Sequence, residues 1–181
     1  LNRVNEPMRI HTGASRVKRI GHGVLASPRV METVTWFRET LGFVRSDDVY
    51  AGKKDNIIGS FNRCDQGDDY VDHHVFFCIN NEKAGLNHLS FEVQNLDDVF
   101  TGHEHLKKNG SYEHFWGLGR HNLGSQVFDY WSDPWGHVHE HWSDSDRMNL
   151  GDGGNLVSAE EGLGSQWGEG APDKFKGHAS P

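Results

Sequence analysis

The sequence has little of several features that whole classes of protein require. Its 181 residues include only 2 cysteines, Cys64 and Cys78, which is too few for a disulfide framework or a four-thiolate metal site. No apolar run approaches the roughly 18 residues of a membrane span, and no signal peptide is recognisable. Lysine and arginine number 18 against 26 aspartates and glutamates, a net charge of -8 that disfavours nucleic-acid and anionic-membrane partners. We therefore expect a cytoplasmic protein that binds neither.

Aromatic residues, glycine and histidine are well represented by contrast. Only 35% of the residues are hydrophobic and the mean hydropathy is -0.71, yet 6 Trp, 4 Tyr and 10 Phe supply enough apolar surface for a core. The 22 glycines predict many turns. The 13 histidines raise a functional question, because imidazole titrates near neutrality and binds metals readily.

Hydrophobic periodicity predicts one order of elements twice along the chain. In the first unit a strand over 19–27 is followed by a helix over 30–41, whose apolar face recurs at helical spacing and which Gly42 ends. Short strands are predicted next, over 43–44, 57–61 and 74–79. His22 lies within the first strand of this unit.

The second unit repeats that order. A strand over 85–93 precedes a helix that Asn95 caps and Asn109-Gly110 ends, with acidic residues in its first turn. Three strands are predicted after it, over 112–116, 126–132 and 137–142. His88 lies in the first strand here, 88 − 22 = 66 residues after His22. We therefore predict an α+β fold in which two βαβββ repeats pack as one domain.

The predicted boundaries divide the chain into four parts. Residues 1–16 are polar, show no period and resemble a linker, which leaves open that a preceding domain is missing. The first repeat covers 17–82 and the second 83–145. Residues 146–181 form a glycine-rich tail, either partly disordered or pinned to the domain by its few large apolar side chains. We expect this tail to cover the mouth of the site.

Three residues are the candidates for a metal site: His22, His88 and Glu140. Strand alternation places Glu140 on one face with Val138 and Trp142, and a carboxylate among apolar neighbours needs a partner. Two imidazoles and one carboxylate form the facial triad that holds Fe(II) with positions open for substrate and dioxygen. The alternative is three unrelated side chains satisfied by hydrogen bonds, but their placement in equivalent strands favours a shared metal.

Several segments resemble one known family, the vicinal oxygen chelate superfamily, and within it the catalytic module of type I extradiol ring-cleaving dioxygenases. The resemblance covers roughly residues 17–144. It is carried by Ile20-Gly-His22, Thr40-Leu-Gly-Phe43, Leu86-Asn-His-Leu-Ser-Phe-Glu-Val93, Leu96-Asp-Asp98 and Asp133-Pro-Trp-Gly136 leading to Glu140. Taken singly, the His22 and Glu140 motifs mark only the superfamily, which also holds isomerases and metal-free binding proteins.

Three further positions resemble the dioxygenase module more narrowly. The pair His73-His74 resembles the segment that carries the family's acid–base histidine; we choose His74, and His73 is the alternative. Gly117-Leu-Gly-Arg-His121 resembles the family's arginine–histidine segment, and Tyr130 matches its active-site tyrosine. The resemblance implies that His74 moves a substrate proton and that His121 and Tyr130 hydrogen-bond substrate oxygens.

The resemblance also implies the reaction and its participants. We expect an Fe(II)-dependent dioxygenase, with Mn(II) the less favoured metal, that adds both atoms of O2 to a catechol beside its hydroxyl-bearing carbons. Its setting is the breakdown of aromatic compounds, and we expect a homo-oligomer. Many members carry another pair of repeats before the catalytic module, so the chain is either a single-domain member or the C-terminal domain of a longer enzyme.

Two alternatives from other classes stay open. One is another superfamily enzyme, an isomerase or thiol transferase that uses Zn(II), Ni(II) or Mn(II). The other is a binding module without catalysis. The remaining histidines are interpreted as surface, interface or solvated groups rather than ligands; they are His11, His103, His105, His114, His137, His139, His141 and His178. Cys78 is expected to be buried.

Overall fold

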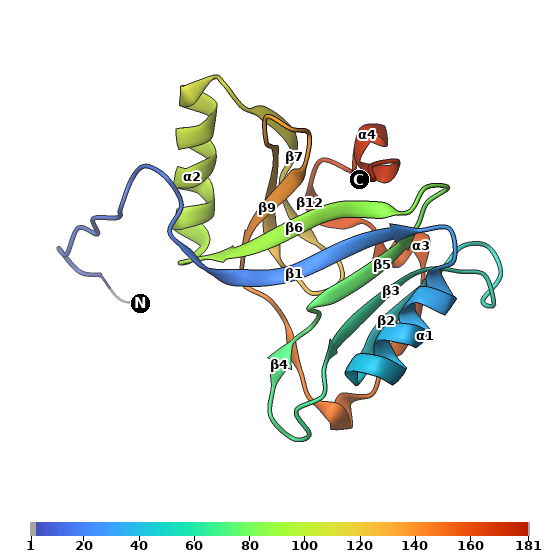
Figure 1. The fold of residues 1–181 in the computed structure, drawn as a ribbon. Coiled ribbons are helices and arrows are strands. Elements are labelled where there is room, and N and C mark those ends of the chain that lie inside the picture. Colours follow the sequence, from blue (N-terminus) through green and yellow to red (C-terminus); the bar gives the residue numbers. More distant parts are fainter. Residues whose placement is uncertain (1–2, 181) are drawn as a thin grey trace.

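A single curved sheet of ten strands organises the chain (Figure 1). The computed structural model describes residues 3–180. The strand order is β11-β2-β3-β5-β1-β6-β9-β8-β7-β12, so β1 and β6 lie side by side at the centre and pair antiparallel. The pairs β1–β5, β6–β9 and β2–β11 are parallel. A separate two-stranded sheet joins β4 to β10.

The strands and helices have the following bounds. The strands are β1 (Val17–Ser27), β2 (Phe43–Tyr50), β3 (Ile57–Cys64), β4 (Val71–Asp72), β5 (Phe76–Asn80), β6 (Gly85–Val93), β7 (Glu113–His121), β8 (Val127–Ser132), β9 (Val138–Ser143), β10 (Arg147–Met148), β11 (Asn155–Ser158) and β12 (Ser165–Gly168). The helices are α1 (Val30–Leu41), α2 (Leu96–Asn109), α3 (Ala159–Gly162) and α4 (Asp173–Lys176), with a 3-10 turn over Leu150–Asp152. No helix within residues 3–180 has the length and apolar character needed to cross a membrane.

The predicted α+β fold is confirmed. The order β1-α1-β2-β3-β5 recurs as β6-α2-β7-β8-β9. Figure 1 shows α1 packed against the first of these units and α2 against the second. Both helices have the bounds that their apolar periodicity predicted. Several strands are longer than predicted, because polar residues at their ends are held by pairing with neighbouring strands rather than by local preference.

Both long helices end at glycines, and one begins at its predicted cap. Gly42 and Gly110 each have φ of 72°, the left-handed conformation in which glycine carries no steric cost. The Asn95 side chain accepts a hydrogen bond from the Asp98 backbone N–H at 3.0 Å. The start of α1 has no side-chain cap.

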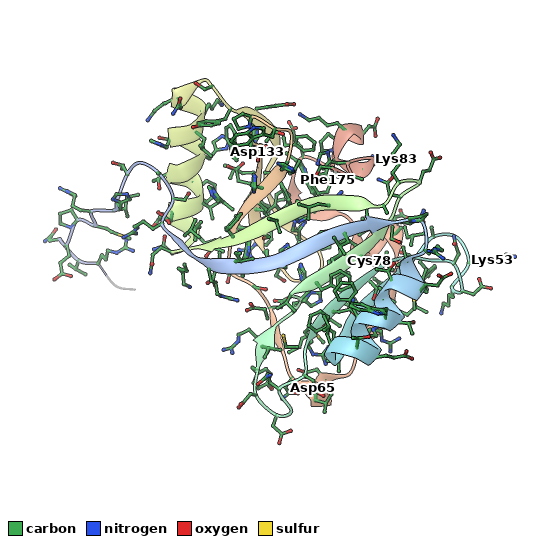
Figure 2. The ribbon with its side chains drawn as sticks, in the orientation of Figure 1. Lys53, Asp65, Cys78, Lys83, Asp133 and Phe175 are labelled. Atoms are coloured by element: carbon green, nitrogen blue, oxygen red, sulfur yellow. The ribbon has the colours of Figure 1, made fainter. Side chains whose placement is uncertain are left out.

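Buried aromatic and aliphatic side chains form several clusters, two of which include residues of α1 and α2. Cys78, labelled in Figure 2, packs under α1 with Val30, Val34 and Phe76. Cys78 is buried, as predicted. Burial raises the pKa of its thiol to about 12, so the thiol stays protonated and inert.

The glycine-rich tail is more ordered than the sequence predicted. Strand β11 extends the sheet beside β2, and β12 extends it beside β7, so the tail supplies both edge strands. Beyond them, Leu86 and Ser180 exchange two backbone hydrogen bonds of 2.8 and 2.9 Å. The sequence missed these strands because four-residue segments are too short to carry a periodic signal of their own.

The centre of the sheet depends on a glycine that precedes His22. A methyl group on Gly21 would approach the Trp142 indole to within 2.5 Å. We expect Gly21→Ala to lower the free energy of unfolding by about 1–3 kcal/mol, because overpacking displaces neighbouring groups. Urea unfolding measures this. Gly23→Ala is the matched control, since its methyl group would meet Leu89 at 3.8 Å, and an equal loss in both variants would contradict the assignment.

Candidate metal centre and its cavity

Three adjacent strands at the centre of the sheet bring His22, His88 and Glu140 together. His22 lies on β1, His88 on β6 and Glu140 on β9, and the register aligns His22 and Glu140 with the same residue, Ser90. The nitrogen Nε2 of His22 lies 3.0 Å from Glu140 Oε2, and Nε2 of His88 lies 3.7 Å from it. The pairing of the two repeat units therefore brings the three predicted ligands close together.

Neighbouring side chains fix how two of these groups point. His88 Nδ1 lies 2.7 Å from Asn87 Oδ1, so Nδ1 carries the proton and Nε2 presents its lone pair toward Glu140. The Ser90 hydroxyl donates to Glu140 Oε2. Glu140 Oε1 has no hydrogen-bond partner within residues 3–180.

The charges of this group fit a bound cation. Burial lowers the pKa of His88 to about 3, so its ring is neutral at pH 7. Burial alone would raise the pKa of Glu140, but the nearby imidazoles, His22 first among them, hold it well below its usual value. Glu140 is 0% exposed, and a fully buried carboxylate requires a compensating positive charge. Two imidazole nitrogens and one carboxylate suit Fe(II), Mn(II) or Zn(II).

A cavity of about 310 Å³ opens beside two of these residues, His22 and His88. His22, His88, His74, His121 and Tyr130 line one part of it. The rest of the wall is mostly apolar and is made by Val24, Ile58, Phe61, Phe77, Ile79, Leu123, Leu163, Ala171 and Phe175. Its volume is within the range of small-molecule sites, and it has a polar part and an apolar part.

Both histidines of the pair 73–74 are buried, but only His74 lines the cavity. The His74 ring lies 4.2 Å from that of His22, centroid to centroid. His73 Nδ1 lies 3.0 Å from His74 Nδ1, and His73 Nε2 lies 2.6 Å from Asp47 Oδ2. The three side chains therefore form a chain, Asp47–His73–His74, that leads from strand β2 to the cavity.

Hydrogen-bond chemistry assigns the protons along this chain. Burial alone would raise the pKa of Asp47, but hydrogen bonds from His73 and Asn155 lower it, so Asp47 is an ionised acceptor. A neutral His73 that donates to Asp47 through Nε2 accepts at Nδ1, so His74 donates through its own Nδ1. His74 Nε2 is therefore the free acceptor. Burial, with repulsion from His22 and His73, keeps the pKa of His74 well below its usual value.

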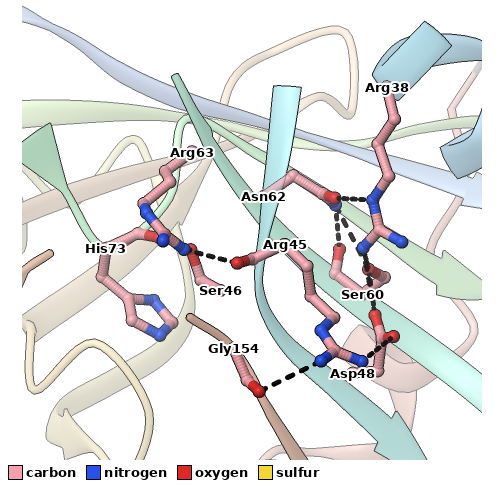
Figure 3. Close-up of polar contacts among 9 residues, drawn as sticks. All are labelled: Arg38, Arg45, Ser46, Asp48, Ser60, Asn62, Arg63, His73 and Gly154. Carbon is pink, nitrogen blue, oxygen red and sulfur yellow. Dashed lines mark hydrogen bonds and ion pairs between the residues drawn. The ribbon is translucent and has the colours of Figure 1, made fainter. Parts of the chain in front are cut away.

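A buried polar network holds His73 in place (Figure 3). The Ser46 hydroxyl donates to the His73 backbone carbonyl, and Arg63 Nη1 donates to Ser46 Oγ at 3.1 Å. Arg63 is 1% exposed and also donates to two carbonyls of the tail, those of Asn149 and Gly153. The tail is therefore tied to the strand that carries Asp47.

His121 on β7 and Tyr130 on β8 also line the cavity. His121 Nε2 lies 3.0 Å from the Tyr130 hydroxyl and 3.6 Å from Glu140 Oε1. Burial, with the negative charge of Glu140, raises the pKa of Tyr130 well above its usual value, so the phenol keeps its proton. Five of the six predicted residues thus line one cavity, and Glu140 lies 3.0 Å from His22 and 3.6 Å from His121.

Comparison with known proteins identifies the family. The family model of the glyoxalase/bleomycin resistance protein/dioxygenase superfamily matches residues 19–140, more than half of the chain. The chain belongs to this superfamily. The predicted membership of the vicinal oxygen chelate superfamily is confirmed, and the match begins at β1 and ends at Glu140.

Individual members of the superfamily show which proteins are similar. Metapyrocatechase 2 from Cupriavidus necator is 32% identical over 160 residues, which cover 87% of this chain and 47% of the relative. A Mn(II)-bound glyoxalase from Novosphingobium aromaticivorans is 27% identical with a TM-score of 0.72, over 90% of this chain and 50% of that one. An extradiol ring-cleaving dioxygenase from B. fuscum shares the fold, with 16% identity and a TM-score of 0.80, over 93% and 46%. The chain spans about half the length of these superfamily relatives.

Other residues of this superfamily member were missed in the sequence. Asp47, Asn87 and Ser90 support the cavity histidines and Glu140, but each is an ordinary polar residue in a strand. Asn87 and Ser90 flank His88 in the sequence, which was a usable signal. Asp47 precedes His73 by 26 residues and gave none. The histidines His137, His139 and His141 alternate with Glu140 and lie off its face, as strand alternation predicts.

Proposed function

We propose that this chain is the catalytic module of a metal-dependent extradiol dioxygenase that opens a catechol ring beside its hydroxyl groups. The observation that carries the proposal is one cavity lined by His22 and His88 of the buried His22–His88–Glu140 cluster and by a free imidazole acceptor, His74. The similarity to metapyrocatechase 2 supports it. Fe(II) is the proposed metal, and when bound it would supply one coordination sphere in which the catechol and dioxygen meet.

The residues of the cavity have distinct tasks in this proposal. His22, His88 and Glu140 would hold the metal on one face. His74 Nε2, kept unprotonated by the Asp47–His73 chain, would accept a hydroxyl proton from the catechol and later return a proton to the ring-opened product. His121 and Tyr130 would donate hydrogen bonds to substrate oxygens as negative charge develops there. The apolar walls would hold the aromatic ring and exclude water.

The lining of the cavity also points to the class of catechol. Away from the histidines, its only charged lining residue within residues 3–180 is Lys176, whose ammonium already pairs with Asp173 at 3.0 Å and whose side chain is 63% exposed. Carboxylate substituents would therefore lose hydration without gaining a buried partner. We propose that catechols with alkyl or aryl substituents are preferred over catechols with acidic ones.

Turnover by the purified, Fe(II)-loaded chain tests this proposal. Anaerobic loading followed by a panel of catechols in air is expected to give coloured ring-opened products, with kcat/KM higher for alkyl- and aryl-catechols than for carboxylated ones. Oxygen uptake in an electrode is the second readout. Stoichiometric iron without turnover of any catechol would contradict the dioxygenase proposal. Turnover of a thiol adduct under nitrogen would favour the alternative of a metal-dependent isomerase.

Asp47 is expected to affect catalysis indirectly, because it acts through His73. Asp47→Asn removes the charge that fixes the His73 proton, and we expect kcat to fall about 10–100-fold with little change in KM or iron content. Stopped-flow or steady-state kinetics measure it. Asp48→Asn is the matched control, because Asp48 pairs with Arg38 instead (Figure 3) and its loss should change stability alone. Equal kcat in Asp47→Asn and the wild type would contradict the chain of proton positions.

A further inference from the structure

A second group of two histidines and one carboxylate lies outside the cavity. His103 comes from α2, His114 from β7 and Asp129 from β8. Asp129 Oδ1 lies 3.1 Å from His103 Nδ1 and 2.8 Å from His114 Nε2, and one ligand atom from each of the three residues lies within 4.8 Å of the others. Three segments separated in sequence therefore converge on one carboxylate oxygen.

The sheet separates this group from the cavity. On β8, Tyr130 lines the cavity and Phe128 stacks on the cavity residue His121, whereas Asp129 bonds to His103 of α2. Side chains that alternate along a strand point to opposite faces, so Asp129 lies on the helix-covered face. The group is therefore distinct from the His22–His88–Glu140 cluster.

The carboxylate is held as a metal-binding carboxylate usually is. Asp129 is 0% exposed, and the Trp131 indole N–H donates to its other oxygen, Oδ2. This bond fixes the plane of the carboxylate and leaves Oδ1 directed between the two imidazoles. Burial alone would raise the pKa of Asp129, but hydrogen bonds from His103, His114 and Trp131 lower it, so the group is anionic at neutral pH.

The two imidazoles are positioned to bind and are reachable from solvent. The His103 side chain is 16% exposed and that of His114 is 34% exposed, so an ion and a water ligand can enter from the His114 side. Within residues 3–180 neither His103 Nε2 nor His114 Nδ1 is engaged in a hydrogen bond. Each ring can therefore move its proton to that outer nitrogen and offer a lone pair at the inner one.

We propose that His103, His114 and Asp129 form a second divalent-cation site that takes Zn²⁺ or an ion of similar ligand preference. Two imidazole nitrogens and a carboxylate oxygen are a common three-ligand set for this ion, and water completes a tetrahedron. The bound ion would replace two hydrogen bonds with coordination bonds and fasten α2 to the β7–β8 pair. The site would act on stability rather than on the cavity chemistry.

Zinc binding by variants of the full chain tests this site. His88→Ala removes one ligand of the first cluster, and after chelator treatment we expect it still to bind one Zn²⁺ per chain, measured by equilibrium dialysis. The double variant His88→Ala/His114→Ala should bind none. His88→Ala/His105→Ala is the matched control, because His105 is an exposed residue of the same helix, and it should bind one.

A thermal readout makes the test independent of stoichiometry. Zinc should raise the melting temperature of His88→Ala and of the His105 control, but not that of the His114 double variant. If His114→Ala prevents folding, as circular dichroism would show, His103→Asn takes its place. Absence of zinc binding by folded His88→Ala would overturn the proposal. Binding that persists in the His114 and His103 variants would also overturn it and would place the ion elsewhere, for example at Asp133, His137 and His139.

Discussion

His88→Ala is expected to abolish stoichiometric iron binding and to lower turnover by at least ~100-fold. Loss of a residue that only supports a metal ligand costs up to about 100-fold, and loss of a ligand itself should cost at least as much. The reason is that His88 is buried, neutral and aimed at Glu140 by Asn87, so its loss leaves only His22 and Glu140 of the three proposed ligands. Metal analysis and oxygen uptake measure the two effects. Circular dichroism checks that the variant folds.

A matched variant separates this effect from a general loss of histidine. His139 also lies in a central strand, but it bonds to Asp133 and faces away from Glu140. His139→Ala should therefore keep its iron and its turnover. Full iron occupancy in His88→Ala would refute the metal centre, and equal iron loss in both variants would refute its specificity.

His74→Asn is expected to lower kcat about 10²–10⁴-fold while iron content stays at the wild-type level, because general acid–base catalysis is lost but the proposed ligands remain. Asparagine keeps a polar side chain of similar reach. Steady-state oxygen uptake with iron-loaded protein gives kcat, and substrate-induced spectral changes under nitrogen report whether the catechol still binds.

A variant of the neighbouring His73 tests whether His74 or His73 is the acid–base residue. His73→Asn leaves the His74 ring facing the cavity and removes only its partner, so we expect a loss of about 10–100-fold. A larger loss in His73→Asn than in His74→Asn would make His73 the acid–base residue. Unchanged kcat in His74→Asn would remove proton transfer by this pair from the mechanism.

Local patterns predicted much of this fold. The helix over Leu96–Asn109 and its Asn95 cap followed from spacing and capping chemistry, and the recurrence of a histidine in the first strand of each repeat pointed to the centre of the sheet. These features depend on stretches of about fifteen residues, within which the spacing of side chains follows directly from the backbone geometry.

Long-range contacts were beyond the reach of those patterns. Asp47 supports His73 from another strand, and β11 and β12 form only because β2 and β7 offer unpaired edges. His103 was interpreted as solvated, yet its side chain is 16% exposed and contacts a buried carboxylate. Helical periodicity placed His103 on α2 but did not reveal which strand residue it would meet.

The edge strands supplied by the tail have a consequence for how the chain folds during synthesis. β11 and β12 leave the ribosome after all the strands they pair with, so until then β2 and β7 present open hydrogen-bonding edges. The same late segment brings Phe175, labelled in Figure 2, against Trp116 and Tyr130 at centroid separations of 4.9 and 5.0 Å. The last segments to be synthesised therefore complete both the sheet and the cavity wall, and chains that lack them should be prone to edge-to-edge aggregation through β2 and β7.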